Sequence, residues 1–152
     1  KKSIWLSPQV LVFKQEFNGM NADQLAKQRQ AYDGLNDLMT TANEIGYKNI
    51  VFGTDIVTSL KALESTNQEL VIRTQWFSNI EVLRQATSKA GELVGLSGPR
   101  NPYGKVGVIE VGALADILVV DGNPLKDMSV LVQPRQNLRV IMKGGSVHKN
   151  TL

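Results

Sequence analysis

The chain has 152 residues, of which 42% are hydrophobic and 20% charged, and it carries a net charge of +3. This length allows one ordinary domain or two small ones, and the composition excludes a disordered chain. The sequence contains no cysteine, which excludes a disulfide framework and thiolate metal sites. The basic residues are scattered, and no apolar run approaches the ~20 residues of a membrane span. We therefore expect neither a nucleic-acid nor a membrane partner.

A strand, a long helix and a second strand are predicted for the first third of the chain. Residues 3–12 have a strand-like pattern, although Pro8 interrupts it and favours a strand followed by a loop. Asn21 is a typical N-cap for an amphipathic helix, and Gly46 is a typical residue just beyond its end. The run 50–52 has no polar interruption, as in a strand buried on both faces. Short connections between these elements predict a βαβ unit.

Further helices are predicted in the middle of the chain. Residues 58–69 are polar and predict a loop with a short helical turn, and residues 70–77 predict a helix. Ser78 and Glu81 have the spacing of a capping box, which predicts that the next helix begins there. A second short helix is expected from residue 88 to Gly95, with its apolar side chains turned inward.

The last third of the chain changes to a β pattern. Residues 96–105 contain two prolines and two glycines and predict a linker. Strands are then expected at residues 106–109 and 117–120. A hairpin of residues 138–142 and 146–148 is expected to close the chain. The sequence thus divides into an α/β portion, residues 1–97, and a β portion, residues 98–152.

Asp55 is the first candidate for a functional residue. It follows the predicted buried strand within the sequence Gly53-Thr54-Asp55, and chemistry sits at the carboxyl ends of parallel strands in α/β folds. The alternative is a helix N-cap or a turn residue. Thr58 and Ser59 lie in the following loop and could contact a substrate. Their alternative is a hydroxyl bonded to nearby backbone.

Other polar residues favour structural interpretations. His148 is the only histidine, and a zinc site without cysteine needs histidines and carboxylates close together. We interpret His148 as a surface residue. Asp116 and Asp121 flank a predicted strand that would separate them by ~17 Å, so we expect turn and strand-end residues rather than an acid–base pair.

Four segments together resemble the carboxyl-terminal part of the amidohydrolase superfamily, closest to its imidazolonepropionase-like and Xaa-Pro dipeptidase-like branch. Residues 51–55 (VFGTD) are similar to the eighth barrel strand with its metal-site aspartate. The other three are similar to the helix pair after the barrel, the return into a small β-sandwich and its closing hairpin. They are residues 80–96 (IEVLRQATSKAGELVGL), 107–125 (GVIEVGALADILVVDGNPL) and 139–147 (RVIMKGGSV). The resemblance implies an α/β fold: a C-terminal fragment of a (β/α)8 TIM barrel over residues 1–97, holding its last two strands and following helices, plus C-terminal strands of the β-sandwich over residues 98–152.

The resemblance also implies a chemistry. In such enzymes a metal, usually zinc, activates a water that attacks an amide, a cyclic amide or an Xaa-Pro peptide bond. Asp55 matches the aspartate that holds the metal or its water and moves the proton to the leaving nitrogen as general base and then acid. The family's His-x-His pair, its bridging ligand and two later histidines have no counterpart in this sequence. We therefore expect the chain alone to bind no metal and to be inactive.

A non-catalytic, self-associating domain derived from the same family is the alternative. Two barrel strands cannot close a barrel, so their edges and faces need a cover, and we expect a homo-oligomer. The substrate expected for the parent enzyme is a small-molecule amide or a dipeptide. The chain opens on Lys1-Lys2-Ser3 rather than methionine, and we expect this start to be a boundary or a processing site inside a longer protein. The sequence leaves the compartment open between cytoplasm and periplasm.

Overall fold

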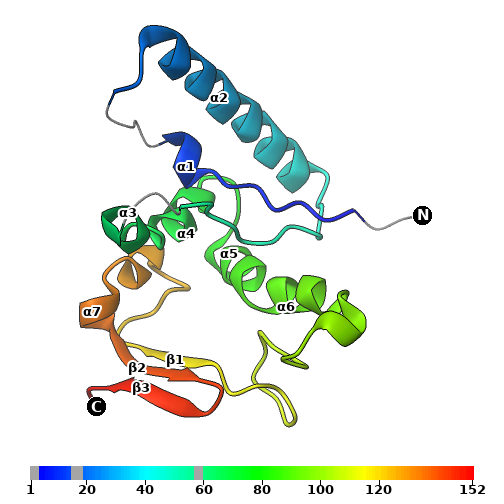
Figure 1. Cartoon of the computed structure of the whole chain (residues 1–152), viewed down its shortest axis with the longest axis vertical. Helices are drawn as coiled ribbons and strands as arrows, with labels where there is room; N and C mark the ends of the chain where they lie inside the picture. The colour runs from blue at the N-terminus through cyan, green and yellow to red at the C-terminus, as the bar shows by residue number, and fades with distance from the viewer. Residues whose placement is uncertain (1–3, 15–18, 57–59) are drawn as a thin grey trace.

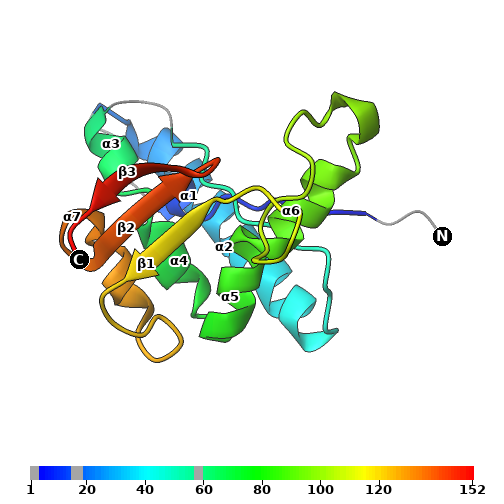
Figure 2. The ribbon, with the colours of Figure 1, turned by 90° about the horizontal axis from the view of Figure 1, so that it is seen from below.

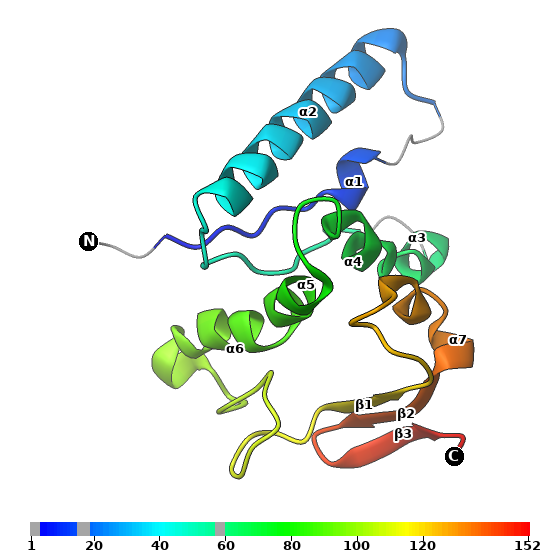
Figure 3. The same ribbon diagram turned by 180° about the vertical axis from the view of Figure 1, so that it is seen from behind.

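The structure is a computed structural model that describes residues 4–14, 19–56 and 60–152. Figures 1 and 3 show the elements stacked in order: the long helix α2 (Ala22–Glu44), two extended segments, the helices α4 to α6, and a small sheet. The two extended segments, residues 4–10 and 47–56, run side by side beneath α2. The chain is thus a mixed α/β structure with its sheet at the end far from α2.

Of the predicted βαβ unit, the helix is present, but in the described ranges its two flanking segments share only one parallel bridge, between Leu6 and Ile50, and form no strand. The Leu6 amide donates to the Asn49 carbonyl at 2.9 Å, and the Val51 amide donates to the Leu6 carbonyl at 2.9 Å. The predicted interruption at Pro8 is seen, because Pro8 has no N–H to donate, but the strand expected before it is only this bridge, and the short helix α1 (Leu11–Lys14) follows where a loop was expected. The prediction of a strand over residues 50–52 is wrong as well.

The predicted long helix is confirmed as α2, together with its cap. The Asn21 side chain accepts from the Gln24 amide at 2.9 Å, and the Gln24 side chain accepts from the Asn21 amide at 2.9 Å, so a reciprocal capping box closes this end. Gly46 follows the helix with φ of 64°, a left-handed conformation that glycine adopts without strain. Along α2, only Met39 and Ala42 are buried. The rest of its expected apolar face is partly or fully exposed.

The middle of the chain folds into four helices, α3 (Leu60–Glu64), α4 (Gln68–Arg73), α5 (Asn79–Ala86) and α6 (Ser88–Gly95). Helix α4 begins and ends earlier than predicted. The capping box predicted for α5 is wrong: Ser78 is the N-cap but makes no side-chain hydrogen bond, and the Glu81 carboxylate lies 3.6 Å from Arg84 instead. None of the residues of α6 is buried, so its predicted inward face is only half covered.

The C-terminal sheet is antiparallel, with strands β1 (Ile117–Val120), β2 (Leu138–Lys143) and β3 (Ser146–Asn150) in the order β1-β2-β3. The predicted hairpin is confirmed. Its turn holds Gly144 at φ of 55° and Gly145 at φ of 82°, which a two-residue turn joining antiparallel strands requires. Two short helices, η2 (Met128–Leu131) and α7 (Pro134–Asn137), lie between β1 and β2 in the chain, and a third, η1 (Gly98–Arg100), follows α6.

The strand predicted at residues 106–109 is wrong. Gly107 adopts φ of 80°, and a Cβ atom there would lie 2.3 Å from the Thr87 carbonyl oxygen. A Cβ atom on Gly91 would similarly lie 2.2 Å from the Val106 carbonyl oxygen. This segment therefore packs closely on the junction of α5 and α6, and its apolar residues do not pair with the sheet.

One hydrophobic cluster joins the extended segments, the middle helices and the start of β2. Its buried members are Val10, Leu11, Met39, Ala42, Ile50, Ile56, Leu70, Ile72, Phe77, Val82, Met128, Leu131 and Leu138. The division into two domains at residues 97 and 98 stays a prediction. Among the helices of the described ranges, none has the length and apolar character that crossing a bilayer demands. Figure 2 shows the sheet from below, with no other element of the described chain lying across it in that view.

Candidate functional site

Asp55 lies where the second extended segment ends. Ile50 and Val51 are buried, Asp55 is exposed, and Ile56 is buried again. Asp55 has φ of 52° and is the only non-glycine residue of the described ranges with a positive φ. Aspartate is one of the residues that adopts this left-handed conformation most readily. The backbone thus presents the Asp55 carboxylate to solvent at the end of a buried segment, between the buried residues Val51 and Ile56.

Thr58 and Ser59, predicted to contact a substrate, lie outside the described residues. Their assignment stays a prediction.

A buried ion pair lies beside the extended segments. Glu69 and Arg73, one turn apart on α4, both have fully buried side chains, and Arg73 Nε donates to Glu69 Oε1 at 2.7 Å. The Glu69 carboxylate also accepts from the amides of Val10 at 3.2 Å and Leu11 at 2.6 Å. A buried carboxylate needs such donors, because burial removes its hydration.

The other N–H groups of Arg73 donate to backbone carbonyls and to one amide side chain. Its Nη1 donates to the Val51 carbonyl at 3.0 Å and to Gln85 Oε1 at 2.8 Å, and its Nη2 donates to the Pro8 carbonyl. The guanidinium carbon lies 5.2 Å from the centre of the Phe52 ring, within range of a cation–π contact. Burial lowers the pKa of Arg73 from its ordinary value, while the negative charge of Glu69 acts in the opposite direction.

The sequence analysis missed this network, although the sequence holds a signal for it. Glu69 and Arg73 are four residues apart, with the apolar Leu70, Val71 and Ile72 between them. Opposite charges at that spacing within an apolar run are the pattern that a buried helical ion pair leaves.

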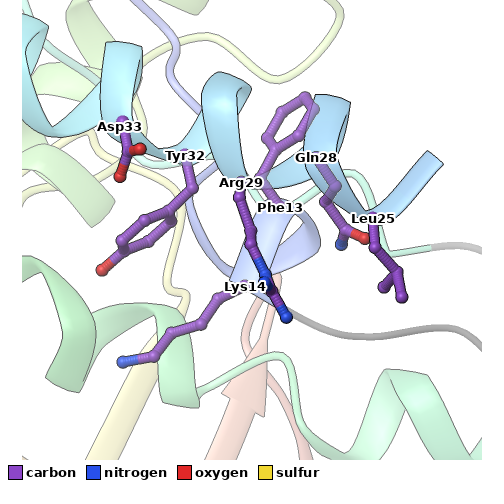
Figure 4. A pocket seen from close by; sticks show the side chains of 7 residues that line it. All are labelled: Phe13, Lys14, Leu25, Gln28, Arg29, Tyr32 and Asp33. Atoms are coloured by element: carbon purple, nitrogen blue, oxygen red, sulfur yellow. The ribbon is translucent and has the colours of Figure 1, made fainter. Parts of the chain in front are cut away.

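A cavity of about 290 Å³ lies between α1 and α2. In Figure 4, Arg29 and Tyr32 extend from α2 toward the side on which Lys14 extends from α1. The residues that line it are Phe13, Lys14, Leu25, Gln28, Arg29, Tyr32 and Asp33. Asp55 does not line this cavity, so the candidate catalytic carboxylate and the cavity are separate features.

Within the described ranges, no group of three or more histidine, aspartate or glutamate side chains could hold a metal ion. Asp55 alone is one carboxylate, and a metal site needs several ligands. The described part of the chain therefore does not fit a metal by itself. Asp116 accepts from the Gly144 amide at 2.6 Å, and Asp121 lies 3.7 Å from Arg139, so both carboxylates serve the sheet. His148 is exposed on β3.

Three solved structures share this fold. An amidohydrolase is 28% identical with a TM-score of 0.81, the match covering 97% of this chain and 35% of the other. A prolidase complexed with N-methylphosphonate-L-proline is 27% identical with a TM-score of 0.80, covering 97% and 35%. The ochratoxinase of A. niger is 27% identical with a TM-score of 0.68, covering 88% and 29%. No curated protein matches the chain.

The chain spans about a third of the length of the solved structures that it matches. The sequence profile of the amidohydrolase family matches residues 2–147, nearly the whole chain. The resemblance seen in the sequence is confirmed by this match and by the structural matches. The chain belongs to the amidohydrolase family.

Proposed function

We propose that the chain is the C-terminal portion of a metal-dependent amidohydrolase that hydrolyses C–N bonds, and that Asp55 is its catalytic carboxylate. In this proposal residues 1–97 are the end of a TIM barrel and residues 98–152 are strands of a small β-sandwich. The observation that carries it is the place of Asp55. It is exposed in a left-handed turn at the end of the second of two parallel segments, the edge at which such folds place their chemistry.

The role of Asp55 follows from the chemistry of a carboxylate next to a water. As a general base it accepts a proton from the water that attacks the amide carbonyl carbon, and the C–O bond forms. As a general acid it then gives that proton to the leaving nitrogen as the C–N bond breaks, so it ends as a carboxylate again. When bound, a divalent metal, zinc in the first instance, lowers the pKa of the attacking water. Because the described ranges hold no group of three or more candidate ligands, we propose that the complete polypeptide supplies the further metal ligands.

The substrate class follows from the relatives. One relative is a prolidase solved with a proline-containing phosphonate, and another is an ochratoxinase. The prolidase with its proline-containing ligand supports Xaa-Pro dipeptides as the first substrates to test, and we propose N-acyl amino acids as a second class. Thr58 and Ser59 follow Asp55 closely in the sequence and are the proposed substrate-contacting residues.

The experiment compares this chain with the complete polypeptide that its gene encodes. Metal content is measured by inductively coupled plasma spectrometry, and hydrolysis is measured on both substrate classes. We expect bound metal and turnover in the complete polypeptide, loss of turnover in Asp55→Asn, and unchanged turnover in the control Asp37→Asn on α2. Turnover that survives Asp55→Asn contradicts the proposal, and so does stoichiometric zinc with turnover in this chain alone.

Self-association is a second proposal, and exposed apolar side chains support it. Leu118 and Val147 on the sheet are each 54% exposed, and Ile109 in the preceding loop is 87% exposed. Exposed apolar side chains on the sheet and the preceding loop could be covered by another chain or by another part of the same protein. We expect a homo-oligomer of this chain in light scattering, and Leu118→Ser with Val147→Ser to weaken it. A monomer at all concentrations contradicts this second proposal.

A further inference from the structure

The parallel pairing of the two extended segments stops just after it begins, and Pro8 is the reason. Leu6 donates its amide proton to Asn49 and accepts from Val51. A parallel ladder would continue with a hydrogen bond from the amide of residue 8 to the Val51 carbonyl. Proline has no N–H, so this hydrogen bond cannot form. The buried Val51 carbonyl needs a donor from elsewhere.

The guanidinium of Arg73 supplies that donor. Its Nη1 lies 3.0 Å from the Val51 carbonyl oxygen. Its Nη2 donates to the Pro8 carbonyl, which the amide of residue 53 would reach if the ladder continued. A guanidinium holds its donors in a rigid planar fork, so one side chain can satisfy two carbonyls at a fixed separation. Arg73 thus joins both segments at the point where their own hydrogen bonding ends.

Glu69 fixes Arg73 in this position and binds the first segment from the other direction. Its Oε1 accepts from Arg73 Nε at 2.7 Å, and its Oε2 accepts from the Leu11 amide at 2.6 Å. Gln85 Oε1 holds the guanidinium at 2.8 Å from a third side. The cation of the ion pair therefore donates to two backbone carbonyls, and its anion accepts from two backbone amides.

The backbone between this network and Asp55 leaves little freedom. The Phe52 amide donates to the Gln85 carbonyl at 3.0 Å. A Cβ atom on Gly53 would lie 2.9 Å from Ser7 Oγ, so the two segments stay in close contact there. Asp55 follows two residues later with φ of 52°. The direction of Asp55 therefore depends on the contacts that hold the backbone from Val51 to Gly53.

We propose that Arg73 is a positioning residue for Asp55. By donating to the Val51 carbonyl in place of the N–H that Pro8 lacks, and by also binding the Pro8 carbonyl, Arg73 fixes residues 51–53 and with them the direction of the Asp55 carboxylate. The inference rests on the proposed catalytic role of Asp55. In this inference the fully buried ion pair on α4 does not contact the substrate, and it affects the turnover of the enzyme through the position of the Asp55 carboxylate.

The test compares Arg73→Met and Arg73→Lys with the control Arg84→Met, whose side chain on α5 is 56% exposed. In the complete polypeptide, kcat and KM are measured per bound metal for an Xaa-Pro dipeptide. We expect Arg73→Met to lower kcat about 100-fold, the loss typical of a misplaced catalytic group, with KM nearly unchanged. Arg73→Lys should recover part of that loss, because one ammonium reaches one carbonyl well but not two. Arg84→Met should match the unsubstituted protein.

Hydrogen–deuterium exchange on this chain gives a readout that does not depend on activity. We expect the amides of residues 52–56 to exchange faster in both Arg73 variants, while the amides of α2 and of the sheet keep their rates. Where Arg73→Met does not fold, Arg73→Lys carries the test, because it keeps a charge opposite Glu69. Faster exchange throughout the chain indicates a role in stability alone and contradicts the proposal.

The two proposals fail in different ways. If Asp55→Asn keeps full turnover, the proposed function is wrong, and exchange at residues 52–56 still shows whether Arg73 holds that segment. If Asp55→Asn abolishes turnover while a folded Arg73 variant keeps its kcat and its exchange rates, the positioning role is wrong and the proposed function stands.

Discussion

Two ion pairs of the same design lie in two different regions of the molecule. On α4, Glu69 and Arg73 are four residues apart and 2.7 Å apart, with both side chains 0% exposed. On α2, Asp23 and Lys27 are four residues apart and 2.8 Å apart, with side chains 71% and 74% exposed. The local geometry is nearly identical. The difference lies in the third partners, because only the buried pair also satisfies the backbone of two extended segments.

The spacing of two charges on a helix therefore does not determine how much their ion pair contributes to the stability of the fold. Water hydrates the α2 pair and screens it, so its loss changes little. The α4 pair has no water to replace a lost partner, so a single substitution strands a charge and several backbone groups. The predictions that follow separate these two regions.

The largest difference is expected between Glu69→Gln and its counterpart Asp23→Asn. Glu69→Gln leaves the Arg73 guanidinium buried without a compensating charge, which we expect to lower the free energy of unfolding by about 3–5 kcal/mol. Asp23→Asn should lower it by no more than about 0.5 kcal/mol. Urea unfolding followed by circular dichroism measures both. Equal losses from the two variants contradict the contrast.

A smaller loss is expected from Gln85→Leu. This change removes one of the two acceptors of Arg73 Nη1 while keeping the side-chain volume similar, and we expect a loss of about 1–3 kcal/mol. Gln30→Leu, at an exposed position of α2, is the matched control and should stay near zero. The same unfolding measurement decides. A Gln85→Leu protein as stable as the control shows that the remaining acceptors of Arg73 suffice.

The two helix caps should differ as well. Asn21→Ala removes a capping box whose hydrogen bonds are both formed, and we expect a loss of about 1 kcal/mol. Ser78→Ala removes a side chain that makes no capping hydrogen bond, so its loss should be smaller. Thermal unfolding of the two variants is the measurement. A larger effect at Ser78 than at Asn21 contradicts this ranking.

The smallest effect is a pH dependence at the sheet. The hydrogen bond from the Gly144 amide lowers the pKa of Asp116 below its ordinary value, and Lys143 adds to this. Because the folded pKa lies below the unfolded one, the stabilisation is present above the unfolded pKa and is lost as pH falls through the folded pKa. We expect the amide signal of Gly144 to shift in an NMR titration below about pH 4. In Asp116→Asn that shift should disappear.

Elements with local signals could be predicted from the sequence. The N-cap of α2 at Asn21, the strand β1 and the turn at Gly144 and Gly145 each depend on residues close in the chain. The strand expected at residues 106–109 failed because Gly107 packs on the Thr87 carbonyl, a contact that periodicity does not reveal. Pairing between strands and packing between helices depend on distant segments, and a short apolar run fits either.

The same limit applies to the candidate site. The position of Asp55 at the end of an extended segment could be predicted, because an apolar run followed by Gly-Thr-Asp indicates such an end, whereas its catalytic role stays a prediction. Arg73 could not be assigned its partners, because its acceptors Pro8 and Val51 lie 65 and 22 residues away in the sequence. A charged pair within an apolar helix predicts burial, but only the fold shows which carbonyls the buried charge meets.

The most direct measurement is the turnover of the complete polypeptide on an Xaa-Pro dipeptide, with Asp55→Asn beside Asp37→Asn. If Asp55 is the catalytic carboxylate, Asp55→Asn lowers kcat by about 10²–10⁴-fold, the range for a lost general acid–base group, while Asp37→Asn leaves kcat unchanged. An Asp55→Asn protein that binds metal and turns over substrate as fast as the unsubstituted protein would contradict the catalytic role of Asp55.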